Sequence, residues 1–459
     1  MTPEEINSIV SSQRKYFLSG ATQSVNFRIN ALKALRTSIK NHEDEIYKAI
    51  KTDLGKSQFE SYMCEVGLTL SEITYMLKHI KGFAKEKNVI TPLAQFHSRS
   101  FKKPSPRGVV LIMSPWNYPF LLTLEPLVDA LAAGNTAILK PSAYSPNVSA
   151  VIEKIIKECF SPEYVCVVNG GRAENNCLLN EHFDYIFFTG SQAVGKEVMR
   201  KAAEYLTPVT LELGGQSPCV VTANANLKLA AKRIVFGKFL NCGQTCVAPD
   251  YIYVQENVKD ALLAELKAET IRQYTNKPLD NPDYGKIINQ KHFERICSLI
   301  DSSKVVLGGA SNADKLQIEP TIMDNITVND AVMGEEIFGP VMPIMTFKTV
   351  DEAINLINSR MHPLALYVFT NKKAEAKRFT TSCNFGGGCI NDTIIHLATS
   401  NMGFGGFGES GMGSYHGKAG FDTFSHYKSI VDKKCWLDLP MRYQPYKKLN
   451  DKLIHMFLK

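Results

Sequence analysis

Two cysteines stand four positions apart in an almost uncharged stretch of the chain. Residues 239–250 read FLNCGQTCVAPD, so Gly-Gln-Thr separates Cys242 from Cys246. Such a pair can hold a metal ion, form a redox couple, or supply one nucleophile beside an unreactive thiol. Two thiolates do not complete a zinc site, and no neighbouring Cys or His adds ligands at a familiar spacing. We therefore expect no metal, and the other two possibilities stay open.

A nucleophilic cysteine needs a base or a positive environment to become a thiolate. The histidines nearest to Cys246 in sequence are His182 and His292, so any base must be brought by the fold. Glu212 is a candidate because it ends the apolar run TLELGG, where burial would raise the carboxyl pKa toward the range of a general base. A strand-edge glutamate that faces water is the alternative.

Two more polar side chains follow apolar runs. Asn117 of SPWNYPF could donate its amide N–H to a developing oxyanion, although loop asparagines commonly cap the backbone. Lys140 of LKPS stands where a strand is expected to end, the edge at which α/β sheets bind ligands. It could bind a ribose or a phosphate, or it could be solvated.

The segment DYIFFTGSQAVGKEV has the order strand, tight turn, helix. Gly190 and Gly195 bracket Ser191, and an anion could bind the free N–H groups at the start of the helix. Thr189 replaces the first glycine of the G-x-G-x-x-G fingerprint. These residues alone support a nucleotide site and an ordinary strand–helix turn equally.

The elements that must position these residues form two alternating series. Helical periodicity fills most of the first hundred residues, and short apolar runs that alternate with helix-length segments then cover residues 108–212 and 215–410. Continuous apolar strands that alternate with helices predict parallel sheets covered on both faces. We therefore predict an α/β fold with two doubly wound domains. The segment 88–106 and the tail from about 425 fit neither series and are candidates for strands that pair across a subunit interface.

Length, composition and charge exclude several classes of protein. A chain of 459 residues is longer than one core usually organises, and a net charge of +7 without a long basic run argues against nucleic acid. The sequence has no stretch of about 18 consecutive apolar residues, so no membrane-spanning helix is predicted. The first residues also lack the pattern of a signal peptide. The 11 cysteines are scattered, as expected in a reducing compartment, so we predict a cytoplasmic protein.

Seven motifs occur in an order that resembles the aldehyde dehydrogenase superfamily: SPWNYPF, LKPS, FTGSQAVG, LELGG, GQTC, EEIFGP and FGGFGESGMG. The resemblance covers about residues 20 to 440 and is strongest to the short class 3 branch. It implies an aldehyde dehydrogenase-like α/β fold with three parts. These are a dinucleotide-binding domain (1–87 and 107–213), a catalytic domain (214–410), and a small β bridging or oligomerisation element (88–106 and 425–459). Class 3 members are typically homodimers, so we expect one here.

The resemblance also assigns roles. Cys246 matches the nucleophile, Glu212 the general base and Asn117 the oxyanion donor, which acts with the backbone N–H of the cysteine. The residues that match contacts to NAD or NADP are Lys140, Gly190, Ser191, Gly195, Glu336 and Phe338. The implied reaction oxidises an aldehyde to the carboxylic acid through a thiohemiacetal and a thioester. Acylating relatives typically lack the glutamate of ELGG, so Glu212 favours hydrolysis.

The sequence says less about which cofactor and which aldehyde the protein prefers. The position three after the motif lysine is often glutamate in the family, but here it is Ala143, so we expect NADP to be accepted alongside NAD. The substrate tunnel is expected to involve a largely apolar set of side chains, Tyr118, Leu121, Thr245, Ile394 and His396. Such a set suits medium-chain aliphatic or aromatic aldehydes.

Two other functions compete with this assignment. A cofactor-independent cysteine hydrolase or acyltransferase would use the same thiol without a nicotinamide. A non-catalytic relative would be expected to lack the nucleophile, so Cys246 counts against it. Cys242 matches no family role, and we expect a buried or lining thiol that oxidation could link to Cys246.

Overall fold

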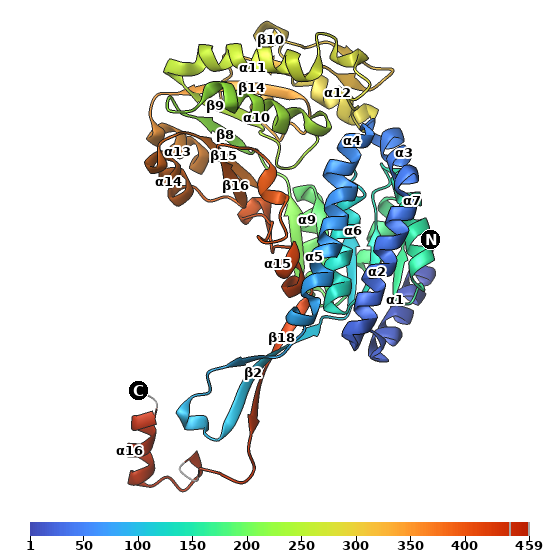
Figure 1. Cartoon of the computed structure of the whole chain (residues 1–459), viewed down its shortest axis with the longest axis vertical. Helices are drawn as coiled ribbons and strands as arrows, with labels where there is room; N and C mark the ends of the chain where they lie inside the picture. The colour runs from blue at the N-terminus through green and yellow to red at the C-terminus, as the bar shows by residue number, and fades with distance from the viewer. Residues whose placement is uncertain (440–441, 458–459) are drawn as a thin grey trace.

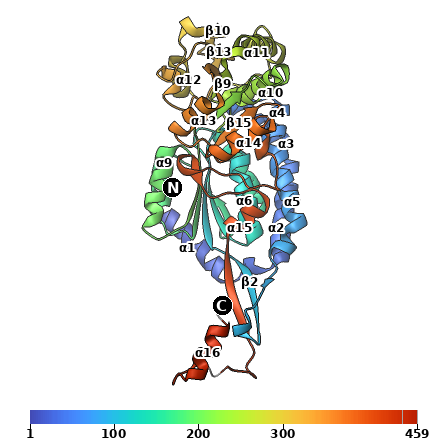
Figure 2. The same ribbon diagram turned by 90° about the vertical axis from the view of Figure 1, so that its left-hand side faces the viewer.

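The computed structural model describes residues 1–439 and 442–457, and it shows two α/β lobes with an arm that extends from the lower one (Figures 1 and 2). Three sheets organise the chain, and they contain six, seven and three strands. Alternating apolar runs and helices therefore produce the predicted α/β architecture.

The six-stranded sheet has the order β17-β7-β6-β3-β4-β5. Its strands are β3 (Val109–Met113), β4 (Thr136–Lys140), β5 (Val165–Val167), β6 (Tyr185–Gly190), β7 (Val209–Leu213) and β17 (Gly411–Met412). All neighbours are parallel except β17, which runs antiparallel to β7. The runs VVLIM and TAILK are buried at every position because helices cover both faces.

Helices from the N-terminal region and from the strand connections cover this sheet. They are α1 (Pro3–Leu18), α2 (Val25–Asn41), α3 (Glu43–Leu54), α4 (Gln58–Ser61), α5 (Gly67–Phe83), α6 (Leu121–Ala133), α7 (Pro146–Cys159), α8 (Arg172–Leu179) and α9 (Gln192–Ala203). The turn between α4 and α5 is π-helical over Tyr62–Val66. Helix α6 is buried at every position between the sheet and α5, so it forms the centre of this lobe.

The seven-stranded sheet has the order β10-β13-β14-β9-β8-β15-β16. Its strands are β8 (Pro218–Val221), β9 (Tyr251–Gln255), β10 (Val305–Leu307), β13 (Thr321–Met323), β14 (Val341–Phe347), β15 (Ala365–Phe369) and β16 (Gly387–Ile390). Only β10 is antiparallel to its neighbour. Its helices are α10 (Leu227–Phe239), α11 (Lys259–Tyr274), α12 (Gln290–Ser298), α13 (Val350–Ser359) and α14 (Lys373–Ser382), and β11 (Ser311–Asn312) and β12 (Gln317–Ile318) form a separate hairpin.

The arm is the three-stranded antiparallel sheet β1-β2-β18. It contains β1 (Lys87–Val89), β2 (Ser98–Pro106) and β18 (Ser425–Lys433), and α16 (Lys448–Phe457) lies at its far end (Figure 1). We expected the two orphan segments to pair across an interface. Within the chain they pair with each other, in a continuous register from Ser425 opposite Pro106 to Lys433 opposite Ser98, and pairing across an interface stays a prediction. Residues 440–441 and 458–459 of the expected bridging segment lie outside the described residues.

The glycine-rich segment returns the chain to the first lobe. Strand β17 places Gly411 opposite Glu212, and α15 (Gly417–Thr423) packs on α5 and α6. Gly411 has φ +143°, and a Cβ there would lie 2.1 Å from the carbonyl oxygen of Leu211. The glycine is therefore required by the close approach of two backbones.

No helix among residues 1–439 and 442–457 has the length and apolar character that crossing a membrane requires.

Candidate active site

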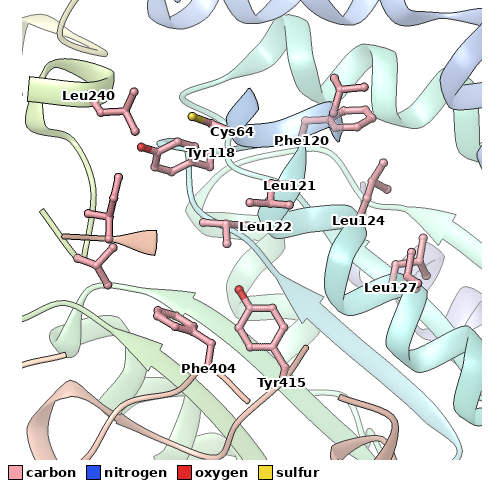
Figure 3. Packing of buried hydrophobic residues seen from close by; sticks show 14 of the residues in the cluster. Cys64, Tyr118, Phe120, Leu121, Leu122, Leu124, Leu127, Leu240, Phe404 and Tyr415 are labelled. Atoms are coloured by element: carbon pink, nitrogen blue, oxygen red, sulfur yellow. The ribbon is translucent and has the colours of Figure 1, made fainter. Parts of the chain in front are cut away.

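A cavity of about 190 Å³ lies between the two lobes' helices and the returning C-terminal segment. Cys246, Thr245, Tyr118, Leu121 and Ile394 all line it, although they come from three segments far apart in sequence. Figure 3 shows Tyr118, Leu121 and Leu122 near the side chains of Leu240, Phe404 and Tyr415. The fold therefore brings the candidate nucleophile and most of the expected tunnel residues together.

The two cysteines of the GQTC segment have different surroundings. Cys246 is partly buried on the cavity wall, whereas Cys242 is buried in a separate core cluster with Tyr284 and Phe293. Asn241 and Cys242 both have φ +52°, which turns the backbone sharply before the nucleophile loop. All 11 cysteines are free thiols. Cys242 is therefore a core residue and is not part of the cavity.

The candidate oxyanion donor is bonded to the nucleophile loop. Asn117 Nδ2 donates to the carbonyl oxygen of Gln244 at 3.1 Å, which leaves the second amide N–H for another acceptor. Beside it, the Tyr118 hydroxyl and Thr245 Oγ1 are 2.6 Å apart. Two side chains of the 117–118 loop thus fix the two residues that precede Cys246.

Glu212 lies on β7, opposite Thr189 of the neighbouring strand β6. Its side chain is buried, and neither carboxylate oxygen has a hydrogen-bond partner among the described residues. Burial raises the pKa of Glu212 well above its ordinary value. The sequence interpretation of a desolvated carboxyl is therefore the one that the structure supports, against the alternative of a water-facing strand edge.

The pKa of the Cys246 thiol is also raised, first by burial and then by the negative charges of Glu336 and Glu212. Glu336 itself has its pKa raised to about 8 by burial and by the nearby Asp250. Burial therefore favours the neutral form of the thiol and of the carboxyl groups around it. Ionisation of the thiol requires a change of surroundings, such as the entry of water or of a positive charge.

The expected cofactor residues lie at the carboxyl edge of the first sheet. Ser191 caps α9, accepting from Val194 N at 3.5 Å, and a Cβ on Gly190 or Gly195 would lie within 2.7 Å of Phe188 or Leu213. Both glycines are thus needed for close packing of the turn. The N–H groups of the first two residues of α9, which precede Val194, could bind an anion.

Lys140 is buried at the end of β4, where Nζ donates to the carbonyl oxygens of Pro141 at 2.8 Å and Gly170 at 2.7 Å. Desolvation lowers its pKa to about 8. Glu336 approaches Gly214 so closely that a Cβ there would lie 2.0 Å from its carboxylate. Phe338, at φ +49°, packs edge-on against Trp116 with ring centroids 5.4 Å apart. Buried polar side chains and glycines that allow close contact thus lie together at the carboxyl edge of the first sheet. This arrangement is compatible with binding of a dinucleotide.

His396 is adjacent in sequence to cavity residues but is not itself among the lining residues, so its place in the substrate tunnel stays a prediction. Ile394, Ile395 and Leu397 line the cavity, and Nδ1 of His396 lies 3.6 Å from Cys389 Sγ. Burial lowers the pKa of His396 to about 4. Ile394 has a positive φ and begins an irregular turn. The side chains of residues 394–397 therefore do not alternate with the period of a helix or a strand.

Several cavity residues were not predicted. They are supplied by the π-helical turn and α5, by α6, by α10, and by the returning segment: Met63, Cys64, Leu68, Leu122, Glu125, Phe236, Leu240, Phe404, Tyr415 and His416. Most are apolar helix residues that carry no local signal of a site. Glu125 and His416 form an ion pair at 3.4 Å and are the charged exceptions in this wall.

Solved structures place this arrangement among nicotinamide-dependent oxidoreductases. The chain superposes on the substrate-bound state of Staphylococcus aureus AldH with a TM-score of 0.97 and 47% identity, covering 99% of both chains. It superposes on an NADP-dependent enzyme of E. coli with a TM-score of 0.87 and 26% identity, covering 95% of this chain and 91% of that one.

Sequence comparison narrows the class to a family. A profile described as the aldehyde dehydrogenase family matches residues 1–430. The chain is 48% identical to the 4,4'-diaponeurosporen-aldehyde dehydrogenase of Staphylococcus aureus, over 95% of both chains. It is 43% identical to the dimeric NADP-preferring aldehyde dehydrogenase of Canis lupus familiaris, over 96% of this chain and 98% of that one. The chain belongs to the aldehyde dehydrogenase family, with class 3 enzymes among its close relatives, and it oxidises aldehydes with NAD or NADP.

Proposed function

We propose that Cys246 is the nucleophile, Asn117 the oxyanion donor and Glu212 the base of this reaction. The observation that carries the proposal is the bond between Asn117 Nδ2 and the carbonyl of Gln244, which fixes an amide donor next to the nucleophile loop. Cys246 lines the cavity with Tyr118 and Thr245, the sequence neighbours of Asn117 and Gln244, so an aldehyde bound there would meet the nucleophile beside the donor loop.

In the proposed reaction, Cys246 releases its thiol proton to solvent water and its Sγ forms a bond to the aldehyde carbon, while the C=O π bond opens to a negative oxygen. The free N–H of Asn117 and the backbone N–H of Cys246 stabilise the negative oxygen of the resulting thiohemiacetal. NAD or NADP, held by the residues proposed below, would supply the hydride acceptor needed to oxidise this adduct to a thioester. Once ionised, Glu212 takes a proton from a water molecule whose oxygen attacks the thioester carbon. The C–S bond breaks, and the proton held by Glu212 passes to the departing thiolate, so that the acid and the thiol are released.

For the cofactor, we propose contacts at the carboxyl edge of the first sheet. The N-terminus of α9, with Gly190, Ser191 and Gly195, would hold a phosphate, and Lys140 would bind the adenosine side. Glu336 and Phe338 would hold the nicotinamide ribose and ring. Ala143 adds no negative charge beside Lys140, which supports use of NADP as well as NAD.

The substrates proposed are medium-chain aliphatic or aromatic aldehydes. The support is the lining of the cavity, where leucines, isoleucines and aromatic rings greatly outnumber charged groups. A panel of aldehydes tests this proposal, since a highest kcat/KM for a short, polar or phosphorylated aldehyde would contradict it.

The arm supports a homodimer. It projects from the body and exposes apolar side chains, with Ile90 95%, Leu93 69% and Trp436 72% exposed. An apolar surface of this kind on a projecting element is typical of an interface that a second copy covers. We propose a cytoplasmic location, which suits a chain whose cysteines are all free.

Cys246→Ser tests the central assignment. Aldehyde-dependent formation of reduced nicotinamide should fall to background while binding of the cofactor is retained. A parent-like rate in the variant would overturn the nucleophile. Membership of the aldehyde dehydrogenase family favours this oxidoreductase over a cofactor-independent hydrolase or acyltransferase. The preference would be reversed if the parent enzyme hydrolysed thioesters and converted aldehydes without any nicotinamide cofactor.

A further inference from the structure

A buried ion pair lies directly behind the loop that carries the oxyanion donor. Lys56 Nζ and Glu65 Oε1 are 2.7 Å apart, and both side chains are fully buried. Removing two charges from water is costly, and apolar residues of similar volume often stabilise a fold as well or better. The stability of the fold alone therefore does not explain this pair.

The pair holds the 117–121 loop at both of its ends. Lys56 Nζ donates to the backbone oxygen of Asn117 at 2.9 Å. The other oxygen of Glu65 accepts from Phe120 N at 2.9 Å and from Leu121 N at 3.4 Å, where α6 begins. The carboxylate thus caps a helix N-terminus, and the ammonium group fixes the residue that supplies the oxyanion donor.

The nucleophile loop meets the same carbonyl. Asn241 Nδ2 donates to the Asn117 oxygen at 2.8 Å and to the Gln244 oxygen at 3.1 Å. Lys56 also lies 3.9 Å from the ring centroid of Tyr118, whose hydroxyl is bonded to Thr245. One ammonium group therefore touches the backbone oxygen of Asn117 and the side chain of Tyr118, the two residues whose side chains contact the residues before the nucleophile.

The backbone that carries Glu65 is unusual. The residues from Tyr62 to Val66 form a π-helical turn between α4 and α5, and such turns often mark functional positions. Met63 and Cys64 of this turn line the cavity, while Glu65 points to the loop behind it. The wider turn therefore serves the cavity wall and the ion pair at once.

We propose that Lys56 and Glu65 are positioning residues that hold Asn117 in the geometry required to stabilise the oxyanion. The inference rests on the proposed role of Asn117. Without the pair, the Asn117 carbonyl keeps only its bond from Asn241, and the loop is free to move relative to Cys246. Since removal of one oxyanion donor commonly lowers kcat by about 10² to 10³-fold, misplacing it should lower kcat by roughly 10 to 100-fold.

The test is a double-mutant cycle. The pair is replaced by Lys56→Met with Glu65→Gln, which leaves no lone buried charge and keeps an acceptor for Phe120 N. We expect kcat for aldehyde oxidation to fall roughly 10 to 100-fold, while the dissociation constant of reduced nicotinamide, measured by fluorescence titration, changes less than about twofold. In an Asn117→Ala background, the same replacement should lower kcat no further, because its effect acts through Asn117.

Three outcomes separate the possibilities. If the pair replacement lowered kcat by the same factor in the parent and in the Asn117→Ala background, the positioning role would be overturned. A parent-like kcat in the pair variant would overturn it too. A parent-like kcat for Asn117→Ala alone would overturn the donor assignment and with it the basis of the inference. If the double replacement does not fold, Glu65→Gln alone is taken through the same cycle and is judged by the same additivity.

A matched control is available in the second lobe. Lys259 and Asp324 form an ion pair at 2.9 Å that is not part of the cavity wall within the described residues. Lys259→Met with Asp324→Asn removes a partly buried pair, with side chains 20% and 9% exposed, and should leave kcat per folded enzyme unchanged. An equal fall of kcat in this control would show that loss of any partly buried pair lowers the rate, which contradicts a specific role for Lys56 and Glu65.

Discussion

Glu212→Gln separates the two halves of the proposed reaction. The amide has the shape of the carboxyl group, and Glu212 has no hydrogen-bond partner among the described residues that the change would break. Thiohemiacetal formation and the first oxidation do not use the base, but hydrolysis of the thioester does. We therefore expect one equivalent of reduced nicotinamide per active site, followed by turnover that is at least about 10²-fold slower than in the parent.

The same substitution changes the pH dependence of stability in a calculable direction. Burial raises the pKa of Glu212 well above its ordinary value of 4.5, so above that pH the folded protein keeps a proton that the unfolded chain has released. The free energy of unfolding of the parent then falls by about 1.4 kcal/mol for each pH unit until the pH reaches the folded pKa. Glutamine does not titrate, so the variant lacks this loss and gains on the parent as pH rises.

Rapid mixing with saturating aldehyde and cofactor measures the burst, and denaturant unfolding from about pH 5 to pH 7 measures the stability difference. Glu204→Gln, at an exposed glutamate, is the control and should leave both unchanged. A variant with no burst would show that Glu212 acts before the oxidation. A difference in unfolding free energy that is constant with pH would refute a buried, neutral carboxyl at this position.

Two other substitutions test the cofactor and the fold. Ala143→Glu should raise the KM for NADP at least about tenfold more than the KM for NAD, because a carboxylate there repels the 2′-phosphate; equal changes in steady-state kinetics would contradict the proposed site. Gly411→Ala should lower the melting temperature and loosen β17 from β7, since the added Cβ would meet the Leu211 oxygen at a positive φ. An unchanged melting temperature would show that the close approach is not fixed.

The strands β3, β4, β6 and β7 of the first sheet could be predicted because each is a largely apolar run of five or six residues, as in TAILK. The short strand β13 was missed, since three residues between Pro320 and Asp324 are too few to show a period. The glycine-rich segment was visible in the sequence only as the motif FGGFGESGMG. Its contact with β7 at Glu212 could not be predicted, because two-residue strand pairs depend on the completed fold.

The parts of the site that escaped prediction share one physical cause. Candidate chemistry could be recognised in Cys246 and Asn117 because their residue types and neighbours are informative, but the contact between their loops runs through backbone carbonyls. Every residue has a carbonyl, so the sequence contains no sign of which one Lys56 or Asn241 will bind. Residues that position a reacting group through the backbone are therefore visible only in the folded chain, and they are where mutagenesis guided by motifs alone would not look.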